Sequence, residues 1–403
     1  MGKCDYKYAT EVLVNNVVPT GICSVGLNEL YGRILAEDLV AEENVPAFAR
    51  SPYDGYAFRA CDTAGASEER PVTFKVIENI RAGQVAEKEV TENTAIRLMT
   101  GAPIPKGADA VCKYEDTVFT DTEVTISAGY KSGANVVAEG EDIKLGTTLA
   151  KAGTRIDIGI IGTAASLGLS AVKVYIKPKA GIISTGDEIV APGEELPYGK
   201  IRNSNSHTIA AALRQLGFET VYLGHARDDV DEICDLIARG EEDCDLIVST
   251  GGVSVGDYDL VPDAMEKKGY SIPVGGVKMK PGMACAYGVK DGRLMLGLSG
   301  NPASSLTNLQ CVCAPALRKM TGLSEYGHRL IKMELADDFR KGSNGVRFIR
   351  GRLDFVDGRV VLRASQDQGN IVMSSVIDCN AYGIIAPDRA PVYAGEIIDG
   401  FIV

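Results

Sequence analysis

Two patterns of apolar and polar positions follow one another along the middle of the chain. Short, wholly apolar runs predict buried strands, and amphipathic stretches with helical spacing separate them. This order of strand, helix and strand predicts a parallel, doubly wound sheet with helices on both faces and ligands beyond the carboxyl ends of its strands. The predicted strands are 180–184, 220–224 and 245–249, and the predicted helices are 206–216, Val230–Arg239 and Ala303–Met320.

The predicted helix boundaries follow from capping residues. Ser204 and Ser206 are capping candidates before the first helix, and Gly217 follows its last apolar position. Gly240 stands in the corresponding place after the second helix.

In the flanking segments, apolar residues recur at every second position, which is the spacing of β-strands. Residues 71–150 and 329–403 contain alternating runs separated by Gly, Asp and Asn turns, and Val356-Asp357-Gly358-Arg359 is typical of a tight hairpin. We therefore expect an α/β multidomain protein: a doubly wound three-layer α/β domain with β-rich satellites, including a C-terminal β-barrel-like domain. The expected domains are 1–45 with 145–176 as one discontinuous N-terminal unit, 46–144, 177–326 and 327–403.

Length and charge narrow the class of protein. A chain of 403 residues is too long for one core and suggests roughly two to four domains. A net charge of −12 without a basic stripe disfavours extended nucleic-acid binding. No apolar stretch of about 18 residues and no signal-peptide pattern is found, so we expect a cytoplasmic protein without membrane contact.

Cysteine and histidine usage limits the chemistry. The ten cysteines form no C-x-x-C pair and are expected to be thiols in a reducing compartment. The three histidines lack ligand spacing, so a zinc or Ser-His-Asp centre has little to work with. Any bound cation must then rely on oxygen ligands.

Three loops should leave the doubly wound sheet at one edge: Ser184–Glu188, Ser249–Asp259 and Ser299–Pro302. Their glycines let backbone N–H groups approach an anion, and their hydroxyls can donate to phosphate oxygens. Each loop alone is more often structural, by roughly two to one. Together, and followed by Lys278 and Lys280 as countercharges, they favour a phosphate-bearing ligand.

Acidic residues in the same loops would repel a phosphate. They are Asp187, Glu188, Asp257 and Asp259. A divalent cation resolves the conflict, because Mg²⁺ prefers carboxylates, water and substrate phosphate oxygens. The alternative for Asp257 or Asp259 is a cap on the next short helix, at about even odds.

Several motifs occur in an order that resembles one family over the whole chain. They are SPYDGYA, RLMTGAPIPKGADAV, GEDI, STGDEI, GKIRNSNS, STGGVSVGDYD, MKPG and SGNPASS. In this respect the chain is similar to the molybdopterin molybdenumtransferases, the MoeA family, and to the E domain of gephyrin.

The resemblance implies an elongated homodimer of four-domain subunits. Each doubly wound domain would hold adenylated molybdopterin, and the partner's C-terminal β domain would complete the cleft. Molybdate would enter the dithiolene, and the pyrophosphate bond would then be hydrolysed with Mg²⁺ to release AMP. The implied protein partners are the pterin adenylyltransferase and molybdoenzyme apoproteins.

Family roles can be carried over to matching positions of this sequence. Asp54, Thr100, Asp142 and Glu188 are the expected catalytic residues, and Asp187, Glu188, Asp257 and Asp259 the expected metal ligands. Arg350, Ser374 and Ser375 are expected to bind molybdate by charge-assisted hydrogen bonds. The expected ligand-binding residues are Ser184, Thr185, Gly186, Asp187, Asn205, Thr250, Gly251, Gly252, Ser254, Lys278, Lys280, Pro281, Ser299, Gly300, Asn301, Pro302 and Ser304.

The sequence departs from the family pattern at a few positions. Tyr53 replaces a usual Met, Asn203 a frequent Asp, and Ser299 a common Pro, while Gly276 and Met283 occupy positions that are often Lys. Two rival functions stay open. A pterin adenylyltransferase shares the doubly wound domain but lacks flanking β domains, and a gephyrin-like scaffold would keep the fold alone.

Overall fold

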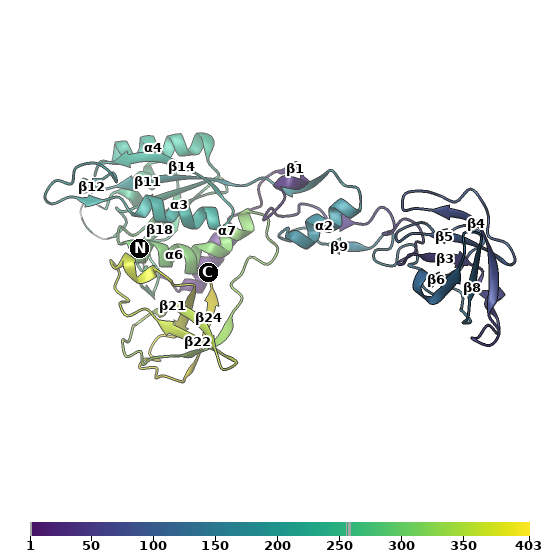
Figure 1. Cartoon of the computed structure of the whole chain (residues 1–403). Helices are drawn as coiled ribbons and strands as arrows, with labels where there is room; N and C mark the ends of the chain where they lie inside the picture. Colours follow the sequence, from purple (N-terminus) through teal and green to yellow (C-terminus); the bar gives the residue numbers. More distant parts are fainter. Residues whose placement is uncertain (1, 255, 257–258) are drawn as a thin grey trace. The chain divides into compact units, whose positions relative to one another are not determined.

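The computed structural model describes residues 2–254, 256 and 259–403. The chain forms two compact units, each described by itself below (Figure 1). The first unit contains the residues up to Glu37, Ala152–Asp157 and Ala171–Val403, and the second contains Asp38–Lys151 and Ile158–Ser170. None of the described helices is long and apolar enough to cross a membrane.

A six-stranded sheet organises the first unit, in the order β14-β11-β15-β19-β18-β16. The four strands β14, β11, β15 and β19 are parallel, as the sequence predicts, and β18 and β16 add an antiparallel edge. The strands are β11 (Lys179–Thr185), β14 (Glu219–Ala226), β15 (Leu246–Thr250), β16 (Ser271–Val274), β18 (Cys285–Lys290) and β19 (Arg293–Leu298).

Helices cover both faces of this sheet because its strands are apolar on both sides. Ile182 of β11 packs in a core with α1 (Tyr6–Asn15), α3 (Asn205–Gln215) and α6 (Pro302–Asn308). The next residue, Ile183, packs on the opposite face with α4 (Val230–Asp243) and α5 (Val261–Lys267). This three-layer arrangement confirms the predicted fold class.

Two helix predictions need correction. Helix α4 passes Gly240 and ends at Asp243; a Cβ on Gly240 would lie 2.9 Å from Ile247 and Leu223 side chains, so close packing explains this glycine. The predicted helix 303–320 contains a π-helical turn at Leu309–Cys313 before α7 (Ala314–Met320). Pro315 has no N–H for the carbonyl of Cys311 four residues earlier, and His328 Nε2 lies 3.2 Å from that oxygen instead.

The C-terminal part of the first unit is a closed five-stranded barrel in the order β21-β22-β20-β24-β23, with β23 returning to β21. The expected hairpin joins β21 to β22, with positive φ at Asp357 and Gly358. The strands of the barrel are β20 (Ile331–Leu335), β21 (Val346–Val356), β22 (Arg359–Ala364), β23 (Ala381–Ile385) and β24 (Ile397–Ile402). The short strand β17 (Met279–Lys280) pairs in parallel with β21.

Segments far apart in the chain complete the first unit. β1 (Ile22–Gly26) pairs with β10 (Ala171–Tyr175), so the chain leaves this unit after its N-terminal segment and later returns. The short strands β12 (Ile189–Val190) and β13 (Ile201–Arg202) also pair with each other.

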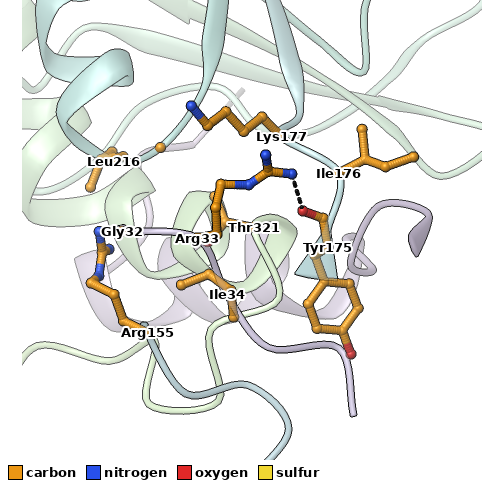
Figure 2. A pocket seen from close by; sticks show the side chains of 10 residues that line it. Gly32, Arg33, Ile34, Arg155, Tyr175, Ile176, Lys177, Leu216 and Thr321 are labelled. Atoms are coloured by element: carbon orange, nitrogen blue, oxygen red, sulfur yellow. Dashed lines mark hydrogen bonds between the residues drawn. The ribbon is translucent and has the colours of Figure 1, made fainter. Parts of the chain in front are cut away.

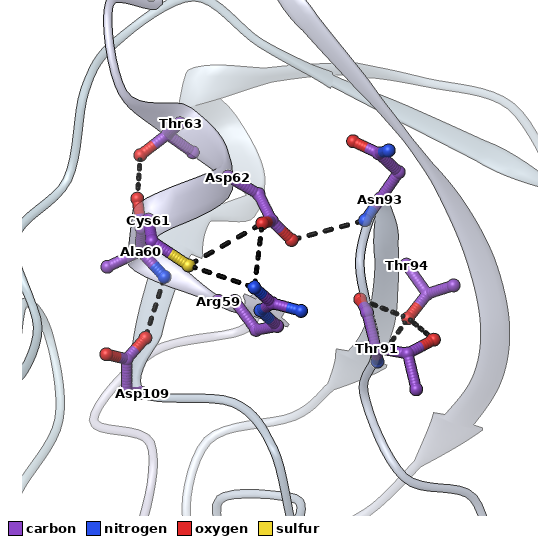
Figure 3. Close-up of polar contacts among 9 residues, drawn as sticks. All are labelled: Arg59, Ala60, Cys61, Asp62, Thr63, Thr91, Asn93, Thr94 and Asp109. Carbon is purple, nitrogen blue, oxygen red and sulfur yellow. Dashed lines mark hydrogen bonds and ion pairs between the residues drawn. The ribbon is translucent and has the colours of Figure 1, made fainter.

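The second unit contains a six-stranded sheet in the order β6-β3-β5-β4-β8-β7. A short 3-10 helix, Ala60–Thr63, follows β3, and the Asp109 carboxylate accepts a hydrogen bond from the Ala60 N–H at its start (Figure 3). The strands are β3 (Gly55–Phe58), β4 (Val72–Ile80), β5 (Thr94–Leu98), β6 (Ala110–Lys113), β7 (Thr117–Phe119) and β8 (Glu123–Ile126); β2 (Leu39–Val40), β9 (Thr148–Ala150) and helix α2 (Ile158–Ser166) lie outside the sheet.

Candidate functional site

A cavity of about 760 Å³ lies where β11, β15 and β19 end. Its volume is within the range of small-molecule sites, roughly 300–1,000 Å³. All three predicted loops contribute to its lining, which confirms that they gather at one edge of the sheet. The sequence-predicted residues that line it are Ser184, Thr185, Gly186, Glu188, Asn205, Thr250, Gly251, Gly252, Ser254, Asp259, Ser299, Gly300, Asn301 and Pro302.

The first loop is held by a network of hydroxyl and amide groups. Ser184 Oγ lies 2.6 Å from the Tyr222 hydroxyl and accepts a 3.1 Å hydrogen bond from the Asn203 amide. Gly186 has φ of 123°, and a Cβ there would lie 2.4 Å from the Glu188 carboxylate. The loop thus places Glu188 over a position that only glycine fits.

The second loop passes close to the first. Gly251 has φ of 101°, and a Cβ there would approach the carbonyl and hydroxyl oxygens of Thr185 to 2.8 Å. The Gly251 N–H donates to the carbonyl of Leu298 at 2.9 Å, which ties β15 to the end of β19. Backbone, rather than side chains, therefore forms this part of the cavity wall.

Asn205 joins the third loop to α3. Its amide Nδ2 donates to the Gly300 carbonyl at 2.8 Å, while its buried Oδ1 has no hydrogen-bond partner among the described residues. An unpaired buried acceptor costs roughly 1–3 kcal/mol. Because Asn205 lines the cavity, a ligand N–H or O–H group would satisfy this oxygen.

Three described carboxylates line the cavity: Glu188, Asp228 and Asp259. Asp259 Oδ2 accepts from the Gly256 N–H at 2.7 Å, so this residue closes a turn rather than capping α5, which has no side-chain cap bond. Asp187 is not among the lining residues; its Oδ1 accepts from the Asp228 N–H at 3.3 Å. Asp257 lies outside the described residues.

The described residues include no group of three or more metal-ligating side chains. Mg²⁺ commonly binds through one or two carboxylates plus water and substrate phosphate oxygens, so this donor set fits a cation that arrives with a phosphorylated substrate. Asp228 and Arg202 also line the cavity, and sequence reasoning missed both. Arg202 stands within the motif GKIRNSNS, which offered a signal for it.

Some expected ligand-binding residues lie elsewhere. Lys280 belongs to β17, which pairs with the barrel strand β21, and the Lys278 carbonyl accepts from the Val346 N–H. Pro281 follows them, and Ser304 is buried in α6. These four residues do not line the cavity. Lys278, Lys280 and Pro281 lie at β17, which belongs to the barrel sheet, and Ser304 is covered within α6.

The chain's own C-terminal segment reaches the cavity through Ile371. The carbonyl of the neighbouring Asn370 accepts a 3.1 Å hydrogen bond from the Ala303 N–H of α6. The chain's own C-terminal segment therefore forms one edge of the cleft, and the contribution of a partner's C-terminal domain stays a prediction. Ser374 and Ser375 follow in the 3-10 helix η5 (Met373–Val376), which packs against α6.

Arg350, on β21, is a fully buried cation without an ion pair among the described residues. Its Nη2 donates to Ser375 Oγ at 3.0 Å and to the carbonyl of Gly369 at 3.1 Å. Nε and Nη1 are buried without a partner, and burial lowers the pKa of the guanidinium. A buried charge without a countercharge costs free energy, and a bound anion would reduce this cost.

The second unit has its own cavity of about 480 Å³ around Asp54 and Thr100. Asp54 Oδ1 accepts from the Thr100 N–H at 2.7 Å and from its hydroxyl at 2.8 Å. The hydrogen bond from the Thr100 N–H has the larger effect and the one from its hydroxyl the smaller, and both lower the pKa of Asp54 below its ordinary value. Asp142 is exposed and does not line this cavity; its N–H donates to the Val45 carbonyl.

Two cations in the second cavity were missed by sequence reasoning. The Arg97 guanidinium stacks 4.8 Å from the Tyr114 ring centroid, and its Nε is buried without a partner. Lys113 Nζ lies 4.4 Å from the Tyr53 ring centroid, so the tyrosine that replaces a usual Met holds a lysine in place. Arg97 stands on β5, which enters the Pro-rich loop quoted above, and Lys113 ends β6, which follows that loop.

The chain is an α/β protein with two polar cavities of small-molecule size. Models of the MoeA N-terminal region (domain I and II), a probable molybdopterin binding domain and the MoeA C-terminal region (domain IV) match residues 5–168, 181–319 and 332–400. The class is thus a protein of molybdenum cofactor biosynthesis.

Named relatives place the chain further. A molybdopterin molybdenumtransferase of Staphylococcus epidermidis is 35% identical over 98% of this chain and 94% of its own, and one of Staphylococcus aureus is 36% identical over 93% and 90%. A crystal structure of the molybdopterin biosynthesis moeA protein from Pyrococcus horikoshii OT3, 31% identical, matches with a TM-score of 0.86 over 100% of both chains. The chain belongs to the molybdopterin molybdenumtransferase family, so the resemblance and the expected enzyme class are confirmed.

Proposed function

We propose that this protein inserts molybdate into the dithiolene of adenylated molybdopterin and releases AMP in a Mg²⁺-dependent step. The observation that carries the proposal is the convergence of three glycine loops on one cavity of about 760 Å³. The curated relatives carry the name of this transferase, which supports the same reaction class.

The loops supply the contacts that a pyrophosphate requires. Backbone around Gly251 and Gly252 approaches the cavity closely, and Arg202 adds a positive charge to the lining. Amide donors and one guanidinium bind phosphate oxygens without a covalent protein nucleophile. The free Oδ1 of Asn205 accepts a hydrogen bond from a ring nitrogen or ribose hydroxyl of the ligand.

Carboxylates that line the cavity are the proposed ligands of the cation. One or two of the lining carboxylates, Glu188, Asp228 and Asp259, would hold Mg²⁺ together with the pyrophosphate oxygens, and Asp187 and Asp257 remain expected ligands. When bound, Mg²⁺ neutralises phosphate charge and polarises the bond to be hydrolysed. Glu188 in addition accepts or donates the proton that accompanies loss of oxide from molybdate.

Arg350 is proposed to bind the molybdate oxyanion. Its two unpartnered guanidinium nitrogens, Nε and Nη1, are the donors that a tetrahedral oxyanion would accept from. The Ser375 hydroxyl accepts from Nη2 and donates to the Val372 carbonyl, so in this arrangement it orients the guanidinium, and it would have to turn to donate to the oxyanion itself. Ser374 stands beside Ser375 in the same 3-10 helix and is proposed to share this role. Fixed donors next to the ligand's sulfurs lower the entropic cost of exchanging oxo ligands for thiolates.

Asp54, Thr100 and Asp142 are proposed to act in the same reaction. Thr100 uses its N–H and its hydroxyl to orient the Asp54 carboxylate, and both bonds go to Oδ1. Oδ2 then points to no described donor and is available to substrate. The lowered pKa keeps this carboxylate ionised, so we propose that it offers a fixed negative charge to the substrate.

The wider proposal includes a cytoplasmic homodimer of subunits with the four domains expected above, working with the adenylyltransferase and apoproteins. Light scattering during size exclusion should give twice the 42.8 kDa mass of the chain. A mass of one chain would remove the dimer from the proposal.

The reaction itself is tested with purified protein, adenylated molybdopterin, Mg²⁺ and molybdate. Release of AMP together with a cofactor that activates an apo-molybdoenzyme is the expected result, and omission of molybdate or Mg²⁺ should stop it. Formation of the adenylate from free molybdopterin and ATP would instead establish the adenylyltransferase rival.

A further inference from the structure

A second cavity in the first unit lies between two arginines and away from the glycine loops. It has a volume of about 180 Å³, and its polar lining consists of Arg155, Gln215, Gln310 and Arg318. Gln215 ends α3, Gln310 stands in the π turn and Arg318 lies in α7. The other described lining residues are Ala212, Leu216, Ala314 and Val403, the last residue of the sequence; none has an acidic side chain, and neither arginine forms an ion pair within 4 Å among the described residues.

Arg318 is a largely desolvated cation without a carboxylate partner among the described residues. Its Nη1 lies 3.5 Å from the Tyr326 carbonyl and 3.4 Å from His328 Nδ1, both long contacts. Burial, and secondly the charge of Arg155, lower the pKa of Arg318. Arg155 is exposed and Arg318 is not, so the repulsion between the two cations acts mainly on Arg318, and an anion bound between them would reduce it.

His328 fixes the orientation of this arginine. Its Nε2 lies 3.2 Å from the Cys311 carbonyl, the oxygen that Pro315 leaves without a helical donor. A carbonyl only accepts, so Nε2 carries the proton and Nδ1 accepts from Arg318. The Nε and Nη2 donors of Arg318 keep no protein partner among the described residues and remain for a ligand.

A small neighbouring cleft is lined by further cationic side chains but is too small to hold an oxyanion. Figure 2 shows Arg33, Arg155 and Lys177 around it, with Arg33 donating to the Tyr175 carbonyl at 3.0 Å. Its volume of about 20 Å³ holds no more than a water molecule. Arg155 lines both cavities, so the larger one lies in a positive field.

We propose that the cavity between Arg155 and Arg318 binds a tetrahedral oxyanion of the phosphate class. Its volume equals roughly six water molecules, which accommodates an ion of five heavy atoms. The two guanidinium groups supply charge-assisted bonds, and the amides of Gln215 and Gln310 supply neutral donors. Occupancy ties α3, α7 and the segment around Arg155 together, which stabilises the folded state.

Calorimetric titration of the 403-residue chain with inorganic phosphate at constant ionic strength tests the proposal. Arg155→Met should weaken binding by about tenfold or more, the loss expected for one charge-assisted hydrogen bond. Arg329→Met is the matched control, because Arg329 is exposed, pairs with Glu325 and does not line this cavity. Equal phosphate affinity of wild type and Arg155→Met would overturn the proposal.

Phosphate bound at the glycine loops is distinguished by Asn205→Asp, which adds a negative charge there and should leave the event at Arg155 unchanged. Nuclear magnetic resonance of His328 gives a local readout, because an anion beside Arg318 offsets its repulsion of the imidazolium. Phosphate should raise the His328 pKa above its value of about 4, and Arg155→Met should prevent this. An unchanged His328 titration in wild type would contradict the site.

Discussion

The cavity at the ends of β11, β15 and β19 differs from the cavity around Asp54 in the groups that line it. Backbone and hydroxyls of glycine-rich loops dominate the first, and Arg202 is the one cation among its described lining residues. The second presents charged side chains, Asp54, Arg97 and Lys113, fixed by Thr100 and by aromatic rings. The first is thus suited to holding a large ligand, and the second to placing charge at one point.

The largest expected effect concerns the carboxylates. Glu188→Ala, and separately Asp54→Ala, should lower the rate of AMP release by roughly 100- to 10,000-fold, the range for loss of a positioned acid or base. Both residues are exposed, so thermal unfolding should match wild type. Wild-type turnover in both variants would remove these residues from the site.

A backbone substitution tests whether the glycine loops hold the ligand. Gly251→Val introduces a Cβ at 2.8 Å from two Thr185 oxygens at a φ of 101°, so it should cost roughly 1–3 kcal/mol of stability and abolish measurable binding of adenylated molybdopterin. Gly193→Val is the control: its φ is 95°, but nothing lies within 4 Å of its Cβ position. If the two variants bound adenylated molybdopterin with equal affinity, the loop at Gly251 would not contact the ligand.

His328 lines neither of these cavities, so its substitution should separate stability from activity. Burial, and secondly Arg318, lower its pKa from 6.5 to about 4. The unfolded state then binds the proton more readily, so the free energy of unfolding should fall as pH drops from 6.5 towards 4, by at most roughly 3 kcal/mol. His328→Phe should flatten this part of the pH profile in chemical denaturation. An unchanged slope would assign the acid sensitivity to other groups.

The smallest effect is expected at Asn205. Asn205→Ala removes the unpartnered Oδ1 and should raise KM about tenfold with little change in kcat, because this contact is made equally in the ground and transition states. Asn16→Ala, outside both cavities, is a matched control. A loss confined to kcat would contradict a role in binding.

Local patterns were sufficient to predict the doubly wound sheet and its loops. The buried runs at β11 and β15 and the amphipathic spacing of α3 each have one favourable arrangement, and the Asp357-Gly358 turn has one favourable conformation. The end of α4 was missed because a packing requirement at Gly240 resembles a C-cap in sequence. No local signal distinguishes the two causes.

Contacts between segments far apart in the chain could not be predicted from the sequence. Lys280 was expected near the loops, but β17 adds to the barrel through pairing with β21. Asp228 lines the cavity after β14, although no motif marks it. The pairing of Arg155 with Arg318 in one cavity joins residues 163 positions apart, a relation set by tertiary packing alone.

A crystal structure with adenylated molybdopterin bound is the most direct test of the central claim. The pyrophosphate should lie within hydrogen-bond distance of the turns at Gly186, Gly251 and Gly300, with its cation against Glu188. A ligand bound elsewhere on the protein, with those three turns left free, would contradict the account.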